Sequence, residues 1–392
     1  MRIHLKRILS VILSAVLAWG ALLLPAGALG AVPTEGEPTP GFTLRCKSAV
    51  LMEASTGKVL YGQNPAEAMP PASVTKIMTL LLVMEAMEAG QITWEETVTA
   101  SARAASMGGS QIFLKEGEQM TVRDLVKSVV IASANDAAVA LAEHTCGSEE
   151  AFVRRMNRRA AELGMTATHF ENTNGLDDTA VGHVTSAMDI AIMSRALIRH
   201  SEILEYSSTW MDTIRGGAFG LTNTNRLVRF YKGCNGLKTG STAKAGFCVS
   251  VTAEREGMTL ICVIMGAESR DIRNAEAQKL LDWGFATYGL YTLEGGEAET
   301  LRVTGGAADR VRTVYPSFTA VLPRADIASV THTVTLPPSV CAPVRAGEAV
   351  GMIAVTCKGQ TVGEVAVTAA ETVEALSFWE LWLRLWQGFW CG

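Results

Sequence analysis

The chain has 392 residues, of which 48% are hydrophobic, and its formal net charge is −5 at pH 7. This length allows two domains and a sizeable core. The net charge is small for the size and no basic run is interleaved with aromatic residues, which argues against nucleic acid as a partner.

Residues 1–31 have the organisation of a secretory signal peptide. Three basic residues precede an apolar run at residues 8–24, and small residues follow. This order predicts a cleaved leader and a mature chain that works outside the cytoplasm. The alternative is an uncleaved membrane anchor, because the apolar run approaches the length that spans a bilayer. Residues 32–42 are rich in Pro, Gly, Thr and Glu without periodicity, which predicts a linker.

Eight cysteines would permit disulfides in that compartment. Cys248 and Cys262 fall in two strand-like runs on either side of a turn, where they could face each other. Buried free thiols are an equally good alternative. No Cys-x-x-Cys pair is present and the six histidines show no ligand spacing, so we expect neither a metal site nor another cofactor.

A hydroxyl and an amine are paired at the start of the first predicted helix. Two prolines lead into an apolar, helix-favouring run that ends before Gly90, with Ser73 in the first turn and Lys76 three residues later. These positions share a helical face, so the two side chains can reach hydrogen-bond distance without strain. The same Ser-x-x-Lys pattern recurs at residues 55–58 and 241–244, but neither match opens a helix.

This pair has the layout of a nucleophile with its own base. A serine hydroxyl is a poor nucleophile until a base takes its proton. Lysine can do so only when neutral, and its ordinary pKa makes the neutral form unfavourable at pH 7 by about 4–5 kcal/mol. Burial and a second cation nearby can offset most of this cost. The sequence should therefore supply another positive group that is distant in the chain and close in space.

A polar break interrupts the next helical region. Apolar spacing predicts a helix after Thr121, and the residues Ser133, Ala134, Asn135 and Asp136 separate it from a second helical run. A serine and an asparagine at such a junction can project into a cleft. The alternative is N-capping of the second helix, for which Ser, Asn and Asp are all preferred.

A Lys-Thr-Gly triplet at residues 238–240 precedes two strand-like runs and a helix at residues 272–288. A strand that carries this triplet can bring a cation and a hydroxyl to its edge. Gly240 has no side chain, so a substrate backbone could approach it closely. The alternative is an ordinary turn.

The composition changes after residue 296. Residues 297–370 contain short Val- and Thr-rich runs broken by Gly and Pro, which predicts a small all-β domain. Residues 375–392 carry four of the eight tryptophans, with apolar residues at three- and four-residue steps. This pattern predicts an amphipathic helix that is too short to span a bilayer and suited to lie in a membrane interface. The alternative is a helix docked on the protein's own core.

The order of Ser-x-x-Lys, Ser-x-Asn and Lys-Thr-Gly resembles the penicillin-binding and serine β-lactamase group of acyl-transferring enzymes. Longer segments look like the low-molecular-mass serine D-alanyl-D-alanine carboxypeptidases, namely residues 71–79, 131–137, 174–177 and 238–242. The resemblance covers roughly residues 46–288, and the leader, the β domain and the terminal helix match that family's layout too.

The resemblance implies an α+β fold of the penicillin-binding/β-lactamase-like transpeptidase type. A five-stranded antiparallel sheet would pack between helices in a carboxypeptidase domain at residues 43–292, with the site between the sheet and an all-helical part. The small β domain at 297–370 and a membrane-anchoring helix at 375–392 would follow. The mature protein would act on the extracytoplasmic face of a bacterial cell membrane.

The resemblance also implies roles for the motif residues. Ser73 would attack the carbonyl between two D-alanines of a peptidoglycan stem pentapeptide, and Lys76 would accept its proton. Lys238 would be the second cation. Ser133 would relay a proton to the departing D-alanine, and Asn135 would hold the substrate amide. β-Lactam antibiotics such as penicillin would acylate Ser73, because they mimic the D-alanyl-D-alanine end.

Further substrate contacts are implied beside the Lys-Thr-Gly triplet. The backbone N–H groups of Ser73 and Ser241 would form an oxyanion hole, next to Gly240. Thr239 and Arg273 would bind the terminal carboxylate, a task for which a guanidinium group is suited.

Four other functions are open at this point. A β-lactamase would need efficient deacylation, and the Glu-x-x-Leu-Asn element of the class A enzymes is absent between Ser133 and Lys238. A transpeptidase or endopeptidase would differ only in the acceptor or in the bond cleaved. An inactive penicillin-binding scaffold is disfavoured by the intact motif residues.

Overall fold

The computed structural model of the chain describes residues 38–177, 180–380, 382–383 and 386. The predicted leader at residues 1–31 and most of the predicted linker lie outside these residues.

A five-stranded antiparallel sheet forms the centre of the N-terminal domain, in the order β2-β1-β9-β8-β7. Two strands come from the start of the described chain and three from much further along, and the two groups meet where β1 pairs with β9. The strands are β1 (Ser48–Glu53), β2 (Val59–Gln63), β7 (Cys234–Thr242), β8 (Gly246–Arg255) and β9 (Met258–Ala267). The middle strands are apolar on both faces, because helices cover both sides of the sheet.

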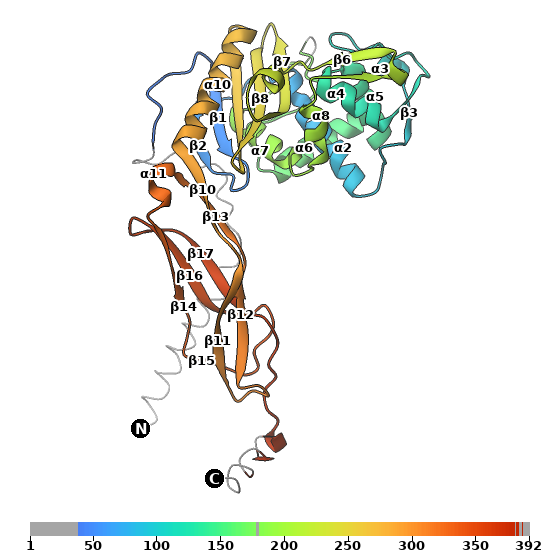
Figure 1. The fold of residues 1–392 in the computed structure, drawn as a ribbon. Helices are drawn as coiled ribbons and strands as arrows, with labels where there is room; N and C mark the ends of the chain where they lie inside the picture. Colours follow the sequence, from blue (N-terminus) through green and yellow to red (C-terminus); the bar gives the residue numbers. More distant parts are fainter. Residues whose placement is uncertain (1–37, 178–179, 381, 384–385, 387–392) are drawn as a thin grey trace, which may run out of the picture.

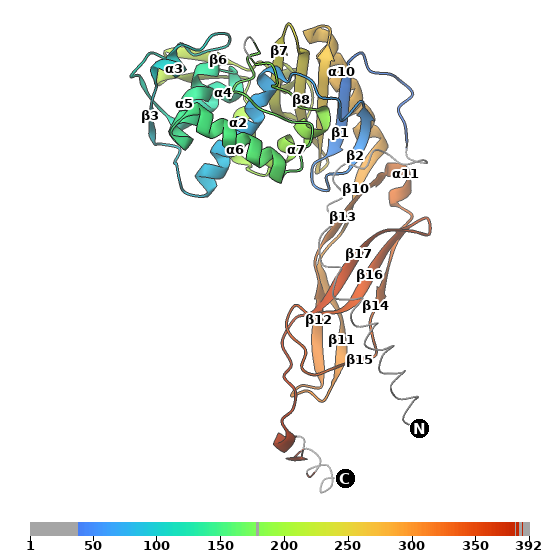
Figure 2. The ribbon, with the colours of Figure 1, turned by 180° about the vertical axis from the view of Figure 1, so that it is seen from behind.

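Helix α10 (Arg270–Thr287) packs on one face of the sheet, and α7 (Ala187–Leu197) packs on the other. Figures 1 and 2 show α10 on the outside of the sheet and the helical part of the domain on its opposite side. The predicted α+β arrangement, with a sheet between helices and an all-helical part beside it, is confirmed.

The helical part is built around α2 (Lys76–Glu88). Ten of its thirteen residues are buried, so α2 lies in the centre of this part rather than at its surface. The helices α4 (Val122–Ile131), α5 (Asn135–Cys146) and α6 (Glu149–Glu162) pack against it, and the short helix α8 (Glu202–Ser207) packs against α4. The shorter elements are η1 (Ala72–Thr75), β3 (Thr97–Thr99), α3 (Ala102–Ala105), β4 (Gln119–Thr121), β5 (Met211–Ile214), η2 (Arg215–Gly217), β6 (Phe219–Thr222) and α9 (Leu227–Phe230).

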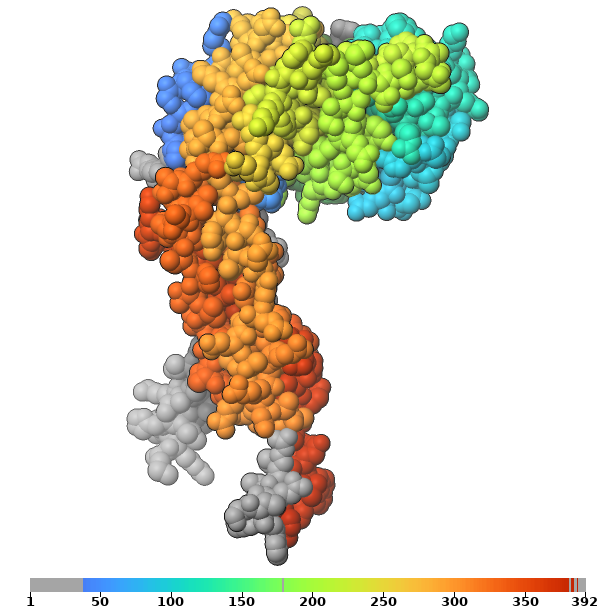
Figure 3. Space-filling view, in the orientation of Figure 1, coloured from blue at the N-terminus to red at the C-terminus, as the bar shows by residue number. Residues whose placement is uncertain are grey.

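A second domain follows, and it is all-β apart from one short helix. Its six-stranded sheet has the order β14-β16-β17-β12-β11-β15, and a separate pair joins β10 to β13. The elements are β10 (Tyr288–Leu293), β11 (Gly296–Thr304), β12 (Arg310–Tyr315), β13 (Phe318–Pro323), α11 (Arg324–Ile327), β14 (Val330–Thr335), β15 (Ser339–Cys341), β16 (Ala349–Cys357) and β17 (Gln360–Ala369). The strand pairing therefore begins at Tyr288, before the boundary that composition suggests. Figure 3 shows the N-terminal domain standing on this narrower domain.

The terminal helix begins after Ser377, whose hydroxyl accepts the N–H of Glu380 while the Glu380 carboxylate accepts from Ser377. The side chains of Phe378, Trp379 and Trp386 are more than half exposed. Figure 1 shows the described residues of this helix at the end of the β domain opposite the N-terminal domain. Within the described residues, no helix has both the length and the hydropathy that crossing a membrane requires.

The proposed pairing of Cys248 with Cys262 is wrong. Cys248 belongs to the core on the α7 side of the sheet, and Cys262 belongs to the core on the α10 side. The register pairs Cys262 with Val251 instead. Both are buried free thiols, the other alternative.

Candidate active site

The predicted nucleophile lies in the turn where η1 passes into α2. Ser73 is in η1, and Lys76 is the first residue of α2, so the helix starts as a 3-10 turn. The Nζ atom of Lys76 lies 2.8 Å from the Oγ atom of Ser73. The pairing expected from the i, i+3 spacing is therefore present. Ala72, just before the serine, has a φ of +49°, a conformation that residues with a Cβ rarely adopt.

The amine of Lys76 has two further partners. It lies 2.6 Å from Oδ1 of Asn135 and 2.8 Å from the carbonyl oxygen of Asn174. A neutral amine has two N–H groups and one lone pair, and both of these oxygens can only accept. They therefore take the two N–H groups, and the lone pair is left for the hydroxyl of Ser73. This is the geometry of a base poised on a nucleophile.

The electrostatics favour this neutral form. Lys76 is completely buried, and burial lowers its pKa well below the ordinary value. The positive charge of Lys238 lowers the pKa further, while the carboxylate of Asp136 opposes the shift. Lys238 thus lies where the sequence argument required a second cation.

Ser133 and Asn135 come from the break between α4 and α5. Ser133 is buried with a φ of +62°, and Asn135 donates from Nδ2 to the carbonyl of Gly108 at 2.6 Å. The capping interpretation of this break is wrong for Ser133 and Asn135, because the N-cap residue of α5 is Ala134, which makes no side-chain capping bond. The asparagine side chain instead bridges Lys76 and the loop that contains Gly108.

Asp136 is a site residue to which sequence reasoning assigned no role. Its fully buried carboxylate accepts backbone N–H groups from Ile112 and Leu114 at 3.0–3.2 Å, and from Ala137 at 2.9 Å. These bonds hold the loop that faces Asn135. The sequence signal that could have indicated this role of Asp136 is its position directly after the Ser-x-Asn motif.

The Lys-Thr-Gly triplet lies in β7 as predicted from the strand pattern. Lys238 is buried and donates to the carbonyl of Thr239 at 3.0 Å. Burial, followed by the charge of Arg273, lowers the pKa of Lys238 to about 7. The hydroxyl of Thr239 donates to that of Thr224 at 2.8 Å, and Ser241 is exposed at the end of the strand.

Glycine is needed at position 240 because the backbone of the nucleophile turn packs closely against it. A Cβ at this position would lie 2.8 Å from the backbone nitrogen of Ser73 and 2.9 Å from the carbonyl oxygen of Pro71. Real Cβ atoms essentially never approach backbone this closely. The strand is therefore pressed against the nucleophile turn, so the first neighbour of Gly240 is the chain itself rather than a substrate.

Arg273 is in the first turn of α10 and is buried, whereas Arg270 is exposed. Its guanidinium donates to Oδ1 of Asn274 at 2.9 and 3.1 Å, and to the carbonyl of Cys248 at 3.4 Å. Burial and the charge of Arg270 lower its pKa to about 10. Its positive charge is one of the two causes that lower the pKa of Lys238.

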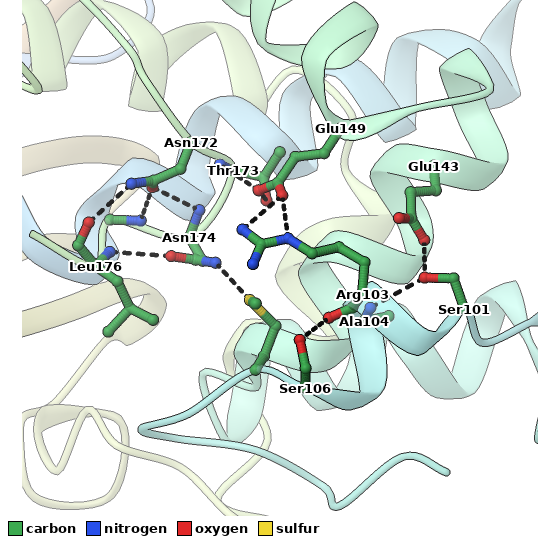
Figure 4. A network of polar contacts seen from close by, with 12 residues as sticks. Ser101, Arg103, Ala104, Ser106, Glu143, Glu149, Asn172, Thr173, Asn174 and Leu176 are labelled. Atoms are coloured by element: carbon green, nitrogen blue, oxygen red, sulfur yellow. Dashed lines mark hydrogen bonds and ion pairs between the residues drawn. The ribbon is translucent and has the colours of Figure 1, made fainter. Parts of the chain in front are cut away.

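A polar network holds the loop whose carbonyl reaches Lys76 (Figure 4). Oδ1 of Asn172 accepts from the backbone of Asn174 and Gly175, and Oδ1 of Asn174 accepts from Leu176. Glu149 ties the same loop to α3, because its carboxylate accepts from Thr173 and from Arg103. The segment at 174–177 carried part of the resemblance, but no motif assigned it a role.

The sequence at residues 33–269 matches the D-alanyl-D-alanine carboxypeptidase family, and residues 291–375 match the C-terminal domain of penicillin-binding protein 5. The D-alanyl-D-alanine carboxypeptidase DacF of Bacillus subtilis is 38% identical over 381 residues, covering 95% of this chain and 96% of that one. DacC of Escherichia coli is 36% identical over 84% of each chain.

Solved structures agree with these matches. Penicillin binding protein 5 of Haemophilus influenzae has a TM-score of 0.76 at 30% identity, covering 88% of this chain and 100% of that chain. Penicillin binding protein 6B of Escherichia coli has a TM-score of 0.71 at 32% identity, covering 86% and 98%. Both domains, the motif order and the site geometry lead to one conclusion. The chain belongs to the D-alanyl-D-alanine carboxypeptidase family and is a low-molecular-mass penicillin-binding protein.

Proposed function

We propose that this chain removes the terminal D-alanine from peptidoglycan stem pentapeptides through an acyl-enzyme on Ser73. The observation that carries this proposal is the surroundings of the Lys76 amine. Two acceptor-only oxygens and complete burial leave a neutral amine whose lone pair faces the serine hydroxyl. This arrangement supplies the base that a serine nucleophile needs at neutral pH.

In the acylation step, Oγ of Ser73 attacks the carbonyl carbon between the two D-alanines, and its proton passes to Nζ of Lys76. The developing negative charge falls on the carbonyl oxygen, which the N–H groups of Ser73 and Ser241 stabilise. The packing of Gly240 against the nitrogen of Ser73 supports this role, because it brings the end of β7 beside the nucleophile. Removal of one such donor typically costs about 3–4 kcal/mol of transition-state stabilisation.

The tetrahedral intermediate then collapses. The bond to the D-alanine nitrogen breaks, and that nitrogen takes a proton from Lys76 through the hydroxyl of Ser133. Free D-alanine leaves and the remaining peptide stays as an ester on Ser73. Water attacks this ester and gives a proton to Lys76. The bond between the acyl carbon and Oγ of Ser73 then breaks, and Oγ takes the proton from Lys76, which restores the serine hydroxyl. Asn135, already bonded to Lys76, is suited to hold the substrate amide next to these groups.

The terminal carboxylate of the substrate is bound by Thr239 and Arg273. Two buried cations, Lys238 and Arg273, give this part of the site a positive potential, and the pKa values of both are lowered by burial. A buried cation without a matching charge attracts an anionic substrate group strongly. The same contacts would receive the carboxylate of a penicillin.

Release of D-alanine from diacetyl-Lys-D-Ala-D-Ala tests the activity, and mass mapping of bound benzylpenicillin tests the nucleophile. We expect release in the parent enzyme, none in Ser73→Ala, and label only on the peptide that contains Ser73. A penicillin complex that turns over rapidly would identify a β-lactamase instead. Label on another residue would refute the assignment of Ser73.

We also propose that the enzyme is exported by its leader and held at the extracytoplasmic face of the membrane by its terminal helix. The exposed aromatic side chains of Phe378, Trp379 and Trp386 support this, because such a patch is suited to a membrane interface. The described part of this helix lies at the end of the β domain opposite the N-terminal domain, so such an anchor would keep the site clear of the membrane (Figure 1).

A further inference from the structure

Three hydrogen bonds run in one direction from Glu171 to the residue before the nucleophile. The backbone N–H of Glu171 donates to Nδ1 of His183 at 3.0 Å, and Nε2 of His183 lies 2.7 Å from the hydroxyl of Thr75. That hydroxyl donates to the carbonyl oxygen of Ala72 at 2.8 Å. Because a carbonyl can only accept, the single proton of the Thr75 hydroxyl is committed to Ala72, and the hydroxyl must accept from Nε2.

The chemistry of the histidine agrees with this direction. With Nδ1 accepting and Nε2 donating, His183 is a neutral imidazole of one defined tautomer. The ring is buried and contacts Phe170 edge-on, with ring centroids 5.7 Å apart. Burial lowers the pKa of His183 to about 4, so the ring stays neutral across the pH range in which a cell envelope works. The three bonds therefore keep their direction under working conditions.

The end of this chain of bonds lies in the most constrained part of the nucleophile turn. Ala72 has a φ of +49°, and its peptide carries the nitrogen of Ser73. Gly175 packs directly against the same carbonyl, because a Cβ added at Gly175 would collide with the oxygen of Ala72. The carbonyl of Asn174, the residue before Gly175, accepts a hydrogen bond from Lys76. One segment of the chain thus contacts both the nucleophile turn and the base.

We propose that His183 is a positioning residue that acts through Thr75 to hold the Ala72 peptide, and with it the hydroxyl and the N–H of Ser73, in the reactive geometry. The inference rests on the proposed role of Ser73 as nucleophile. His183 touches neither the substrate nor the reacting atoms, and no proton of the reaction passes through it. Its effect should fall on the rate of acylation and leave ground-state binding unchanged.

The test compares Thr75→Val, Thr75→Ser and His183→Ala with the parent enzyme. Thr75→Val keeps the shape of the side chain and removes the hydroxyl, whereas Thr75→Ser keeps the hydroxyl. The matched control is Thr185→Val, which removes another buried threonine hydroxyl, one that is bonded to Thr168 and not to the nucleophile turn. Timed binding of fluorescent penicillin gives the dissociation constant of the first complex and the acylation rate constant separately.

We expect Thr75→Val and His183→Ala to lower the acylation rate constant by about tenfold or more, with the dissociation constant changed less than about twofold. Thr75→Ser and Thr185→Val should stay within about threefold of the parent. The double variant of Thr75→Val and His183→Ala should be no slower than the slower single variant, because both break the same chain of bonds.

Two results would overturn the inference. One is acylation by Thr75→Val at the parent rate, and the other is an equal loss in the Thr185→Val control, which would indicate a general loosening of the fold. If His183→Ala does not fold, the comparison of Thr75→Val with Thr75→Ser still tests whether the hydroxyl that links His183 to Ala72 is needed for acylation. Mass mapping of the penicillin label in the parent enzyme tests the role of Ser73 separately from that of His183. Label on a residue other than Ser73 would refute the proposed function, whatever the variants show.

Discussion

The backbone carbonyl of Asn174 accepts a hydrogen bond of 2.8 Å from the amine of Lys76, although 98 positions separate the two residues. A carbonyl cannot return a proton, so this contact always takes one N–H group from the amine. Together with Oδ1 of Asn135 it fixes where the lone pair of the neutral amine points. The reactivity of Ser73 therefore depends on the shape of a loop as well as on the motif lysine.

The first prediction concerns the base itself. Lys76→Arg should lower the penicillin acylation rate by about 10²–10⁴-fold, because a guanidinium stays protonated and cannot take the serine proton. The measurement is timed acylation by fluorescent penicillin, with circular dichroism as a control of folding. Retention of more than about a tenth of the parent rate by a folded variant would show that Lys76 is not the base.

The second prediction concerns pH. The neutral amine of Lys76 is the active form, so acylation should fall as the pH drops below its lowered pKa. Lys238 is the second cause of that lowering, after burial. Replacing Lys238 by methionine should therefore raise the pKa of Lys76 and move the acid limb of the acylation profile to higher pH. An acid limb that stays in place, in a variant that still acylates measurably, would contradict the role of Lys238 as second cation.

The third prediction is that the same Lys238→Met variant is more stable than the parent. Lys238 has a folded-state pKa of about 7 against an ordinary value of 10.5, so below about pH 7 the folded protein holds a buried ammonium ion that the unfolded chain would solvate. This cost is fully present below the folded pKa and disappears as the pH rises through the unfolded value. We expect a gain of about 1–4 kcal/mol in the free energy of unfolding near pH 6, and a smaller gain near pH 10.

Urea unfolding at the two pH values measures this gain. The conservative Lys238→Arg variant is the control, because it keeps a buried cation and should not be stabilised. Equal stability of the methionine variant and the parent at both pH values would mean that the charge of Lys238 is compensated in the folded state.

The fourth prediction concerns Gly240. An added Cβ would lie 2.8 Å from the nitrogen of Ser73, so Gly240→Ala must push β7 away from the nucleophile turn. We expect about tenfold or greater loss of acylation, although no catalytic side chain is altered. The control is Gly220→Ala on β6, where nothing lies within 4 Å of the added Cβ. Similar rates for the two variants would show that the strand and the turn do not need this close fit.

The fifth prediction concerns the terminal helix. A mature chain that lacks residues 377–392 should leave the membrane fraction and keep its release of D-alanine, because Ser377 and the described residues that follow it lie at the end of the β domain opposite the N-terminal domain (Figure 1). Sedimentation of the two forms with membrane vesicles measures this. If the truncated chain still sediments, the anchor lies elsewhere, and N-terminal sequencing will show whether the leader is retained.

The sequence indicated much of this site, because catalytic side chains of the group recur in a fixed order. Ser73, Lys76, Asn135 and Lys238 could be brought together from three short motifs and a pKa argument. The capping interpretation failed at Asn135 because local preference cannot show that a distant lysine competes for the side chain. The N-cap residue of α5 is Ala134, and the side chain of Asn135 bonds instead to Lys76 and to the carbonyl of Gly108.

Other parts of the site leave little trace in the sequence. The carbonyl of Asn174 is a backbone group, and every residue has one, so no residue type marks its position. His183 looked like an isolated histidine without ligand spacing, and its contact with Thr75 spans 108 positions. Gly240 was assigned to a substrate contact, because a sequence cannot show which neighbour needs the missing side chain.

The elongated β domain has a consequence for where the enzyme can work. In the proposed arrangement it is a spacer. The terminal helix at one end of it would lie in the lipid surface, and the N-terminal domain with the active site would lie at the other end. Such a spacer selects the layer of the wall whose peptides can be trimmed, since strands nearer or farther than its length are out of reach. A change in the length of this spacer would move that layer without altering the chemistry of the cleft.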